Sequence, residues 1–336
     1  MSAASREKAL QITREHGVVD LHADTLLWMR HAGYDIGKRH QNRIPTAPYG
    51  FHVDLPRLRE GGVRVQLFGI VTLPVLGERG CAAAAIDSAR LLEHEAARYP
   101  SELAVVRSRV DLDAALQRGA IAGILSLEGA HALQHDLENL EGLFLAGLRS
   151  LGLAHFSSNS AAPCAYGVGA SNEKPLSDFG REVVAFCDAK KINLDLAHLG
   201  RAAFFEACHH APYPRIVSHT GLFGAHNHWR NIDDEQLRAI ADTGGVVGVM
   251  FAPRYLGGNG VAKIAAHIKY GINTAGEDAI SLGSDFDGFI VPTDDVQGAD
   301  GYPNIAEALL DLGLSETVVA KVMGQNALRV LRQCLP

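Results

Sequence analysis

The sequence predicts a (β/α)8 barrel, a TIM barrel with elaborated βα loops, that forms a single domain over residues 1–336. Three observations lead to this fold class. Eight short apolar runs recur along the chain, longer amphipathic stretches separate them, and no linker or low-complexity tract interrupts the alternation. The runs lack the polar–apolar alternation of half-exposed sheets, which is typical of buried parallel strands. Eight such strands alternating with helices fit a closed barrel, with a doubly wound open sheet as the alternative.

Most of the predicted strands are rich in β-branched residues or leucine and are bounded by glycine or proline, which punctuate regular structure. In chain order they are Gly17–Leu21, Val63–Val71, Ala120–Leu127, Leu148–Ala154, Ile192–Ala197, Arg215–Ser218, Gly245–Phe251 and Ala279–Gly283.

The predicted helices lie between and after these runs. One is alanine-rich, one begins at a capping serine, and one begins with acidic residues and ends before a pair of glycines. These three and the two that close the chain are Cys81–Arg98, Ser177–Lys190, Asp233–Thr243, Ile305–Leu312 and Ser315–Leu331. Two long polar segments, Lys38–Gly50 and Phe156–Pro175, are expected to be elaborated βα loops over the active face.

Composition excludes several classes of protein. Hydrophobic residues make up 47% and charged residues 21% of the chain, an ordinary globular balance. The net charge is −7 and no basic cluster offsets it, which argues against binding to nucleic acid. No apolar stretch reaches the ~18 residues that a membrane span needs. The five cysteines lack the close spacing of a zinc or redox motif, and we expect a cytoplasmic protein with reduced thiols. A homodimer is left open.

Polar side chains stand at the carboxyl ends of six predicted strands. In a parallel barrel these ends meet at one rim, where barrel enzymes place their chemistry. The motifs are Asp20-Leu-His22-Ala-Asp24, Ser126-Leu-Glu128-Gly, His155, Asp195-Leu-Ala-His198, Ser218-His219 and Ser284-Asp285-Phe-Asp287.

These residue types predict a metal centre. His22 and Asp24 are two apart on an extended segment, so their side chains share one face. Glu128 has two oxygens that can bridge two cations, and Gly129 leaves room beside it. His198 and His219 end successive strands, where a single histidine alone would more often belong to the core. Mixed nitrogen and oxygen ligands suit Zn²⁺, with Mn²⁺, Co²⁺ or Fe²⁺ open, and their number exceeds one tetrahedral site. We therefore expect two divalent ions.

Two further residues are candidates for roles above the metals. Arg230 follows the sixth strand and can hold a substrate carboxylate bidentately. Asp285 is nearer its strand end than Asp287 and is our candidate for the acid/base, while Asp287 could orient its neighbours. His226 and His228 are interpreted as loop residues.

Together these motifs, with Arg230-Asn231 and the C-terminal Met323-Gly-Gln-Asn326-Ala-Leu-Arg329, resemble the membrane dipeptidase (renal dipeptidase, peptidase M19) family of the amidohydrolase superfamily. The matches run in family order from Asp20 to Arg329. The segment Phe156–Tyr166 departs from the Asn-x-x-Trp-type sequence of mammalian members, which bears on substrate choice.

The resemblance implies a barrel with two zinc ions. His22 and Asp24 would bind one, His198 and His219 the other, and Glu128 would bridge them. It also implies that His155 contacts the substrate carbonyl, Arg230 the substrate carboxylate, and Asp285 acts in catalysis. The implied activity is hydrolysis of dipeptides by a metal-bridging hydroxide, with tolerance for a D-residue at the C-terminal position.

Two other hypotheses stay open. The first is another amidohydrolase-superfamily reaction, on a cyclic amide, a lactone or an N-acyl amino acid. Such relatives often open with His-x-His and use a carboxylated lysine, whereas this chain has His22-Ala-Asp24 and Glu128. The second is a non-catalytic barrel that binds a metal or a peptide, although no ligand or acid/base is visibly missing.

Overall fold

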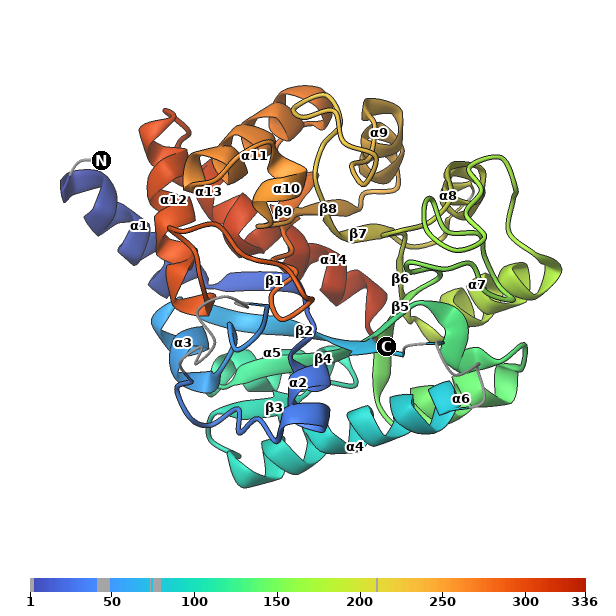
Figure 1. Cartoon of the computed structure of the whole chain (residues 1–336). Coiled ribbons are helices and arrows are strands. Elements are labelled where there is room, and N and C mark those ends of the chain that lie inside the picture. The colour runs from blue at the N-terminus through green and yellow to red at the C-terminus, as the bar shows by residue number, and fades with distance from the viewer. Residues whose placement is uncertain (1–2, 41–48, 73, 75–79, 210) are drawn as a thin grey trace.

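Eight parallel strands close into a barrel in the computed structural model, which describes residues 3–40, 49–72, 74, 80–209 and 211–336. Strand β2 pairs with β1 on one side and with β4 on the other, and this second pairing closes the sheet. The predicted barrel is therefore confirmed, and the open-sheet alternative is wrong (Figure 1). The barrel strands are β1 Val18–Ala23, β2 Val63–Val71, β4 Ile121–Glu128, β5 Leu148–Gly152, β6 Asn193–Asp195, β7 Ile216–Thr220, β8 Val246–Val249 and β9 Ile280–Leu282.

A short extra strand, β3 (Leu103–Val105), was not expected from the sequence. It pairs with Ile121–Gly123 at the start of β4, whereas β5 pairs with Leu125–Leu127 further along the same strand. A three-residue strand shows too little of the period-two pattern to be recognised from sequence.

Helices connect the strands and surround the barrel (Figure 1). Ser177 accepts a hydrogen bond from the backbone of the first helical turn, as its predicted capping position requires, and Asp233, predicted only as an acidic helix start, does the same. The helices are α1 Ala3–His16, α2 Thr25–Ala32, α3 Leu55–Glu60, α4 Cys81–Arg98, α5 Arg109–Gln117, α6 Leu137–Leu145, α7 Asp178–Lys190, α8 Arg201–Cys208, α9 Asp234–Asp242, α10 Pro253–Leu256, α11 Val261–Ala275, α12 Tyr302–Asp311, α13 Glu316–Ala320 and α14 Asn326–Cys334.

The C-terminal helix differs from the continuous helix predicted over Ser315–Leu331. A π-helical turn, Lys321–Gln325, separates α13 from α14. At the end of this turn the Asn326 side chain donates hydrogen bonds to the carbonyl oxygens of Glu277 and Ile280, at 2.7 and 2.9 Å. Asn326 thus attaches the last helix to the first residue of β9 and to the segment just before it.

The loops over the carboxyl ends of the strands are long, as expected. Residues 156–175 contain no helix or strand. In the other predicted loop, Lys38–Gly50, residues 41–48 lie outside the described part of the chain. Among the helices that the structure describes, none has the length and apolar character that crossing a bilayer requires.

Candidate metal centre

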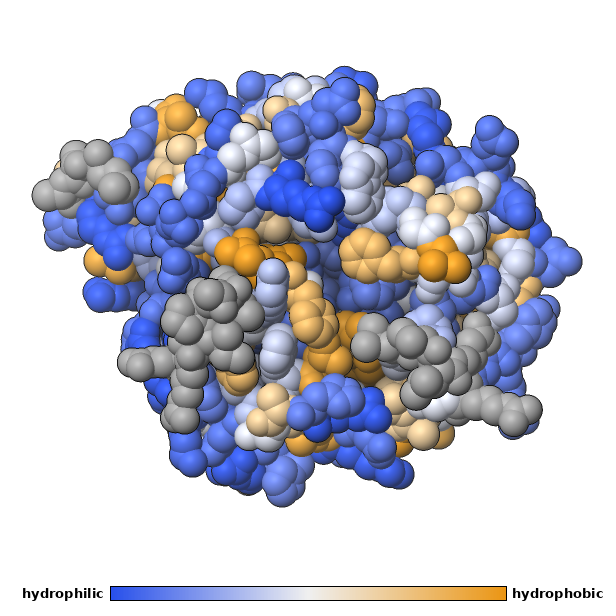
Figure 2. All heavy atoms as spheres, in the orientation of Figure 1, coloured by the Kyte–Doolittle hydropathy of each residue, from blue (hydrophilic) through white to orange (hydrophobic). Residues whose placement is uncertain are grey.

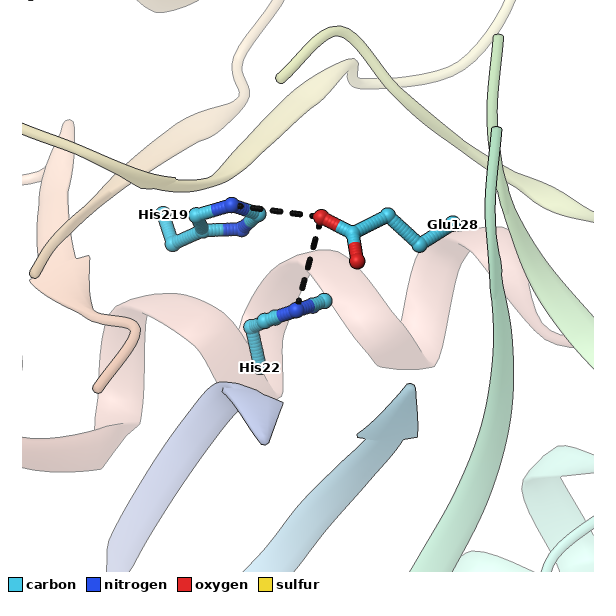
Figure 3. A group of neighbouring side chains, drawn as sticks. All are labelled: His22, Glu128 and His219. Carbon is cyan, nitrogen blue, oxygen red and sulfur yellow. Dashed lines mark ion pairs between the residues drawn. The ribbon is translucent and has the colours of Figure 1, made fainter. Parts of the chain in front are cut away.

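The carboxyl ends of β1, β4 and β7 bring His22, Glu128 and His219 together at the centre of the barrel mouth (Figure 3). His22 and His219 stack with ring centroids 4.0 Å apart. One Glu128 oxygen, Oε1, lies 3.7 Å from His22 Nε2 and 3.5 Å from His219 Nε2. The same oxygen lies 3.2 Å from His198 Nε2 and 3.6 Å from His155 Nε2. Four imidazoles therefore converge on one carboxylate.

Asp24 and Asp285 complete the cluster on the β1 side. Donor atoms of His22, Asp24 and Asp285 lie within 4.8 Å of one another, as do those of His22, Glu128 and His219, and those of Glu128, His155 and His198. All seven residues of these three groups were predicted from sequence. The structure brings every one of them to the same cavity wall or directly beneath it.

Two glycines make room for the cluster. A side chain at Gly69 of β2 would collide with Asp24 Oδ1. Gly129 has φ +81°, and an added Cβ there would lie 3.1 Å from the Cβ of His155. The same Cβ would lie 2.7 Å from His131 Nδ1, so the space beside Glu128 is occupied by the side chains of His131 and His155.

Hydrogen bonds from outside the cluster orient the two histidines of β6 and β7. Tyr166 Oη lies 2.7 Å from His198 Nδ1, and Ser218 Oγ lies 2.9 Å from His219 Nδ1. Because Nδ1 of each ring is engaged in this way, each Nε2 is directed into the site. Histidines that bind metals are commonly oriented by a hydrogen bond of this kind to their other ring nitrogen. His198 also has φ +64°, a conformation that non-glycine residues adopt rarely and mostly at functional sites.

The donor set fits divalent cations. Both ring nitrogens of His22, Asp24 Oδ1 and Glu128 Oε2 are buried without a hydrogen-bond partner among the described residues. Buried polar atoms are normally paired, so unpaired nitrogen and oxygen atoms gathered in one cluster fit residues that would hold a cation. Imidazole nitrogens and carboxylate oxygens are the ligands that zinc and related metals take in hydrolases.

Burial and mutual charge shift the pKa values of the cluster in two opposite directions. Burial holds the pKa of His198 and of His219 well below the usual value for histidine. Repulsion from Arg230 adds to this effect at His198, and repulsion from His22 adds to it at His219. Both imidazoles are therefore neutral, the form in which histidine can bind a metal. Burial and the neighbouring Asp24 raise the pKa of Glu128 well above its ordinary value. Burial opposes a charge on His22, but Asp24 and Glu128 raise its pKa well above normal.

Arg230 is 3% exposed, and its guanidinium reaches the rim of the cluster. Its Nη2 donates to the backbone oxygen of His219 at 2.9 Å and lies 3.0 Å from His198 Nε2. The backbone N–H of Arg230 donates to Nδ1 of His228, so that loop histidine has a role in holding the arginine. No carboxylate within the described residues forms an ion pair with Arg230. A buried guanidinium in this state is well suited to an external carboxylate.

Asp285 and Asp287 have different surroundings. Asp285 lines the cavity, and burial together with Asp24 raises its pKa to about 7, although His22 opposes the shift. Asp287 is fully buried and accepts hydrogen bonds from Thr25 Oγ1 and from the backbone N–H of His52. Asp287 therefore fixes the loops beside the cavity, as the sequence allowed, and Asp285 is the acid that faces it.

The cavity above the cluster has a volume of about 250 Å³. Besides the predicted residues it is lined by side chains that the sequence analysis missed, namely Leu27, Val71, Phe156, Tyr255, Phe289 and Ile290. Apolar side chains carry no chemical signature in a sequence, and only their place in the loops reveals them. Figure 2 shows hydrophobic residues among hydrophilic ones in the middle of this face.

Comparison with known proteins agrees with this geometry. Residues 6–335 match the family model for membrane dipeptidase (peptidase family M19). An uncharacterised protein in the pqqA 5′ region of Klebsiella pneumoniae is 31% identical, over 72% of this chain and 92% of that protein.

Two solved structures are similar over almost the whole chain. A metallopeptidase from Rhodobacter sphaeroides, liganded with a phosphinate mimic of the dipeptide L-Ala-D-Ala, has a TM-score of 0.82 at 26% identity, covering 94% of this chain and 99% of its own. Dipeptidase AC, a metallopeptidase of family M19, has a TM-score of 0.82 at 27% identity, covering 95% and 98%. The family match over nearly the full chain shows that this protein belongs to the membrane dipeptidase family, peptidase family M19, and is a hydrolase of the metallo-dipeptidase class.

Proposed function

We propose that this chain is a binuclear zinc dipeptidase that accepts a D-residue at the C-terminal position of its substrate. The observation that carries the proposal is the convergence of four imidazoles on Glu128 Oε1, beside a buried arginine that no carboxylate of the described residues neutralises. The phosphinate mimic of L-Ala-D-Ala bound to the Rhodobacter sphaeroides metallopeptidase supports the stereochemical part.

The ligands divide between two ions around a shared carboxylate. His22 and Asp24 would hold one, His198 and His219 the other, and Glu128 would serve both. When bound, the two ions supply Lewis-acid polarisation of the scissile carbonyl and lower the pKa of a coordinated water toward ~7.

The remaining residues bind and orient the substrate. Arg230 pairs with the free carboxylate and so selects short peptides. Burial lowers the pKa of His155 to about 3, so its imidazole is neutral and donates an N–H to the carbonyl oxygen as negative charge develops there. Asp285 stands on the opposite side of the cluster, next to Asp24 and His22. Its raised pKa suits a group that accepts a proton from water and returns it to the leaving amine.

A dipeptide screen tests this function. Zinc-loaded protein is assayed against matched L-L and L-D dipeptides, with chelator-treated protein as the control. We expect zinc-dependent hydrolysis of both series. Hydrolysis that survives complete removal of metal would contradict the mechanism, and turnover of lactones or cyclic amides without turnover of dipeptides would favour another amidohydrolase reaction.

A further inference from the structure

The loop that follows β9 has an unusual backbone. Three of its non-glycine residues, Asp285, Asp287 and Phe289, have φ values of +62°, +66° and +58°. A bulky side chain at positive φ is a genuine outlier, and such conformations persist where the surrounding structure enforces them, commonly at functional sites. The strain at Asp285 and Asp287 serves the cluster described above, but no part of the proposed mechanism uses Phe289.

Phe289 is held in the cavity mouth. Its side chain is exposed, at 58%, and it lines the cavity together with Leu27 of α2 and the buried Ile290. The Trp28 ring packs against it with centroids 5.5 Å apart, and Trp28 Nε1 donates to the backbone oxygen of Asp287 at 2.7 Å. A large apolar side chain is thus fixed in a strained conformation while much of its surface faces solvent.

Neighbouring contacts place Phe289 at one end of the cavity. A Cβ added at the adjacent Gly288 would lie 2.5 Å from Asp285 Oδ1 and 2.9 Å from Asp24 Oδ2. The loop backbone therefore runs directly against the Asp24–Asp285 side of the cluster. Arg230 lies at the other side, against His198 and the backbone of His219. Phe156 belongs to the arginine side, because its ring packs on His155 and His198 at 4.7 and 5.1 Å.

These positions orient a dipeptide. Its carboxylate is drawn to Arg230 at one side and its peptide bond lies over Glu128, so its N-terminal residue extends toward Asp24 and Asp285. The side chain of that residue then meets Leu27, Phe289 and Ile290. Each of these three is apolar, and burying apolar surface between them and the substrate is favourable.

We propose that Phe289, with Leu27 and Ile290, forms the pocket for the N-terminal side chain of the substrate and makes the enzyme selective for dipeptides with an apolar N-terminal residue. This inference rests on the proposed dipeptidase function. It explains why a strained phenylalanine is kept at an exposed position, since the substrate would cover its ring during turnover.

The test is a series of dipeptides that share D-Ala at the C-terminal position and carry Gly, Leu, Lys or Asp at the N-terminal position. We measure kcat/KM on zinc-loaded wild type, Phe289→Ala, Phe289→Leu and Phe289→Glu. Phe223→Ala is the matched control, because Phe223 is also an exposed aromatic in a βα loop, at 41%, but does not line the cavity.

Wild type should prefer Leu over Gly by at least tenfold, the size of effect that a few methylenes have in an apolar pocket. Phe289→Ala should reduce this Leu/Gly ratio by about tenfold and leave hydrolysis of Gly-D-Ala within about twofold of wild type. Phe289→Leu should retain most of the preference. Phe289→Glu should raise the Lys/Leu ratio, a change in selectivity that mere loss of packing would not produce. Phe223→Ala should match wild type.

The outcomes separate the two proposals. If wild type hydrolyses dipeptides but its Leu/Gly ratio is near one, or if Phe289→Ala leaves the ratio unchanged, the pocket is wrong and the dipeptidase function stands. If zinc-loaded wild type hydrolyses none of the series, both proposals are overturned.

Discussion

At the scale of single residues, Glu128 is the centre of the site, because one of its oxygens lies within 3.7 Å of four histidine nitrogens. A carboxylate that serves both ions should affect both when it is removed. We predict that Glu128→Ala lowers the occupancy of both metals, whereas Asp24→Ala lowers that of one. Elemental analysis of purified proteins measures this directly. A wild type that retains one tightly held ion, or a Glu128→Ala protein that keeps two, would contradict the binuclear arrangement.

Asp285 and Asp287 are both buried at the same strand end, but we predict different effects when each is replaced by asparagine. Asp285→Asn removes the proton acceptor that faces the cavity, and should lower kcat by ~10² or more with metal content retained. Asp287→Asn places an amide against the donors Thr25 Oγ1 and His52 N, and should destabilise the fold by ~1–3 kcal/mol. Steady-state kinetics and chemical denaturation distinguish the two. Normal turnover in Asp285→Asn would remove that residue from the mechanism.

At the scale of elements, apolar runs were sufficient to locate all eight barrel strands, with Val63–Val71 matching β2 at both ends. Buried parallel strands need continuous apolar sequence, so the signal is strong. Several helices were missed. Helix α8 (Arg201–Cys208) is eight residues long and has only a weakly amphipathic sequence, and α2 (Thr25–Ala32) begins directly after Asp24. Their boundaries depend on the loops and strands they pack against, which a single sequence does not reveal.

The site was predictable for the same reason as the strands. Each predicted metal ligand stands at a strand end or within three residues of one, and closure of the barrel brings distant strand ends together. Tyr166, Tyr255 and Phe289 could not be predicted, because they come from irregular loops whose course depends on packing. The hydrogen bond from Tyr166 to His198, for example, joins two residues 32 apart in the chain.

The π-helical turn at Lys321–Gln325 gives a prediction at this scale. Asn326 donates two buried hydrogen bonds to backbone oxygens just before and within β9. We expect Asn326→Ala to leave both carbonyl groups without this donor and to lower the free energy of unfolding by ~1–3 kcal/mol. Urea denaturation measures the loss. The metal content of the variant should remain that of wild type, since Asn326 contacts the start of β9 and the metal cluster lies beyond its other end. A stability equal to wild type would show that the turn does not depend on Asn326.

At the scale of the whole molecule, the metal centre joins strands from all around the barrel. His22 comes from β1, Glu128 from β4 and His219 from β7, so bound ions would connect segments that are far apart in the chain. Ions that bind only the folded state stabilise it by mass action, by ~4 kcal/mol at a free concentration one thousand times Kd. We predict that chelation lowers the midpoint of thermal unfolding and that added zinc restores it. An unchanged midpoint after verified metal removal would contradict this coupling.

The pairing of Arg230 with a substrate carboxylate is the most direct test of the whole account, since it links the geometry of the site to the length of the substrate. The measurement is kcat/KM for a dipeptide, the same dipeptide amidated at its C-terminus, and a tripeptide, on zinc-loaded wild type and Arg230→Met. We predict that wild type discriminates against the amide by ~2–5 kcal/mol in transition-state free energy, because the buried guanidinium loses its charged partner. Tripeptides should also be poor substrates. Arg230→Met should weaken the dipeptide strongly and hardly change the amide, whereas equal values for the dipeptide and its amide in wild type would contradict the account.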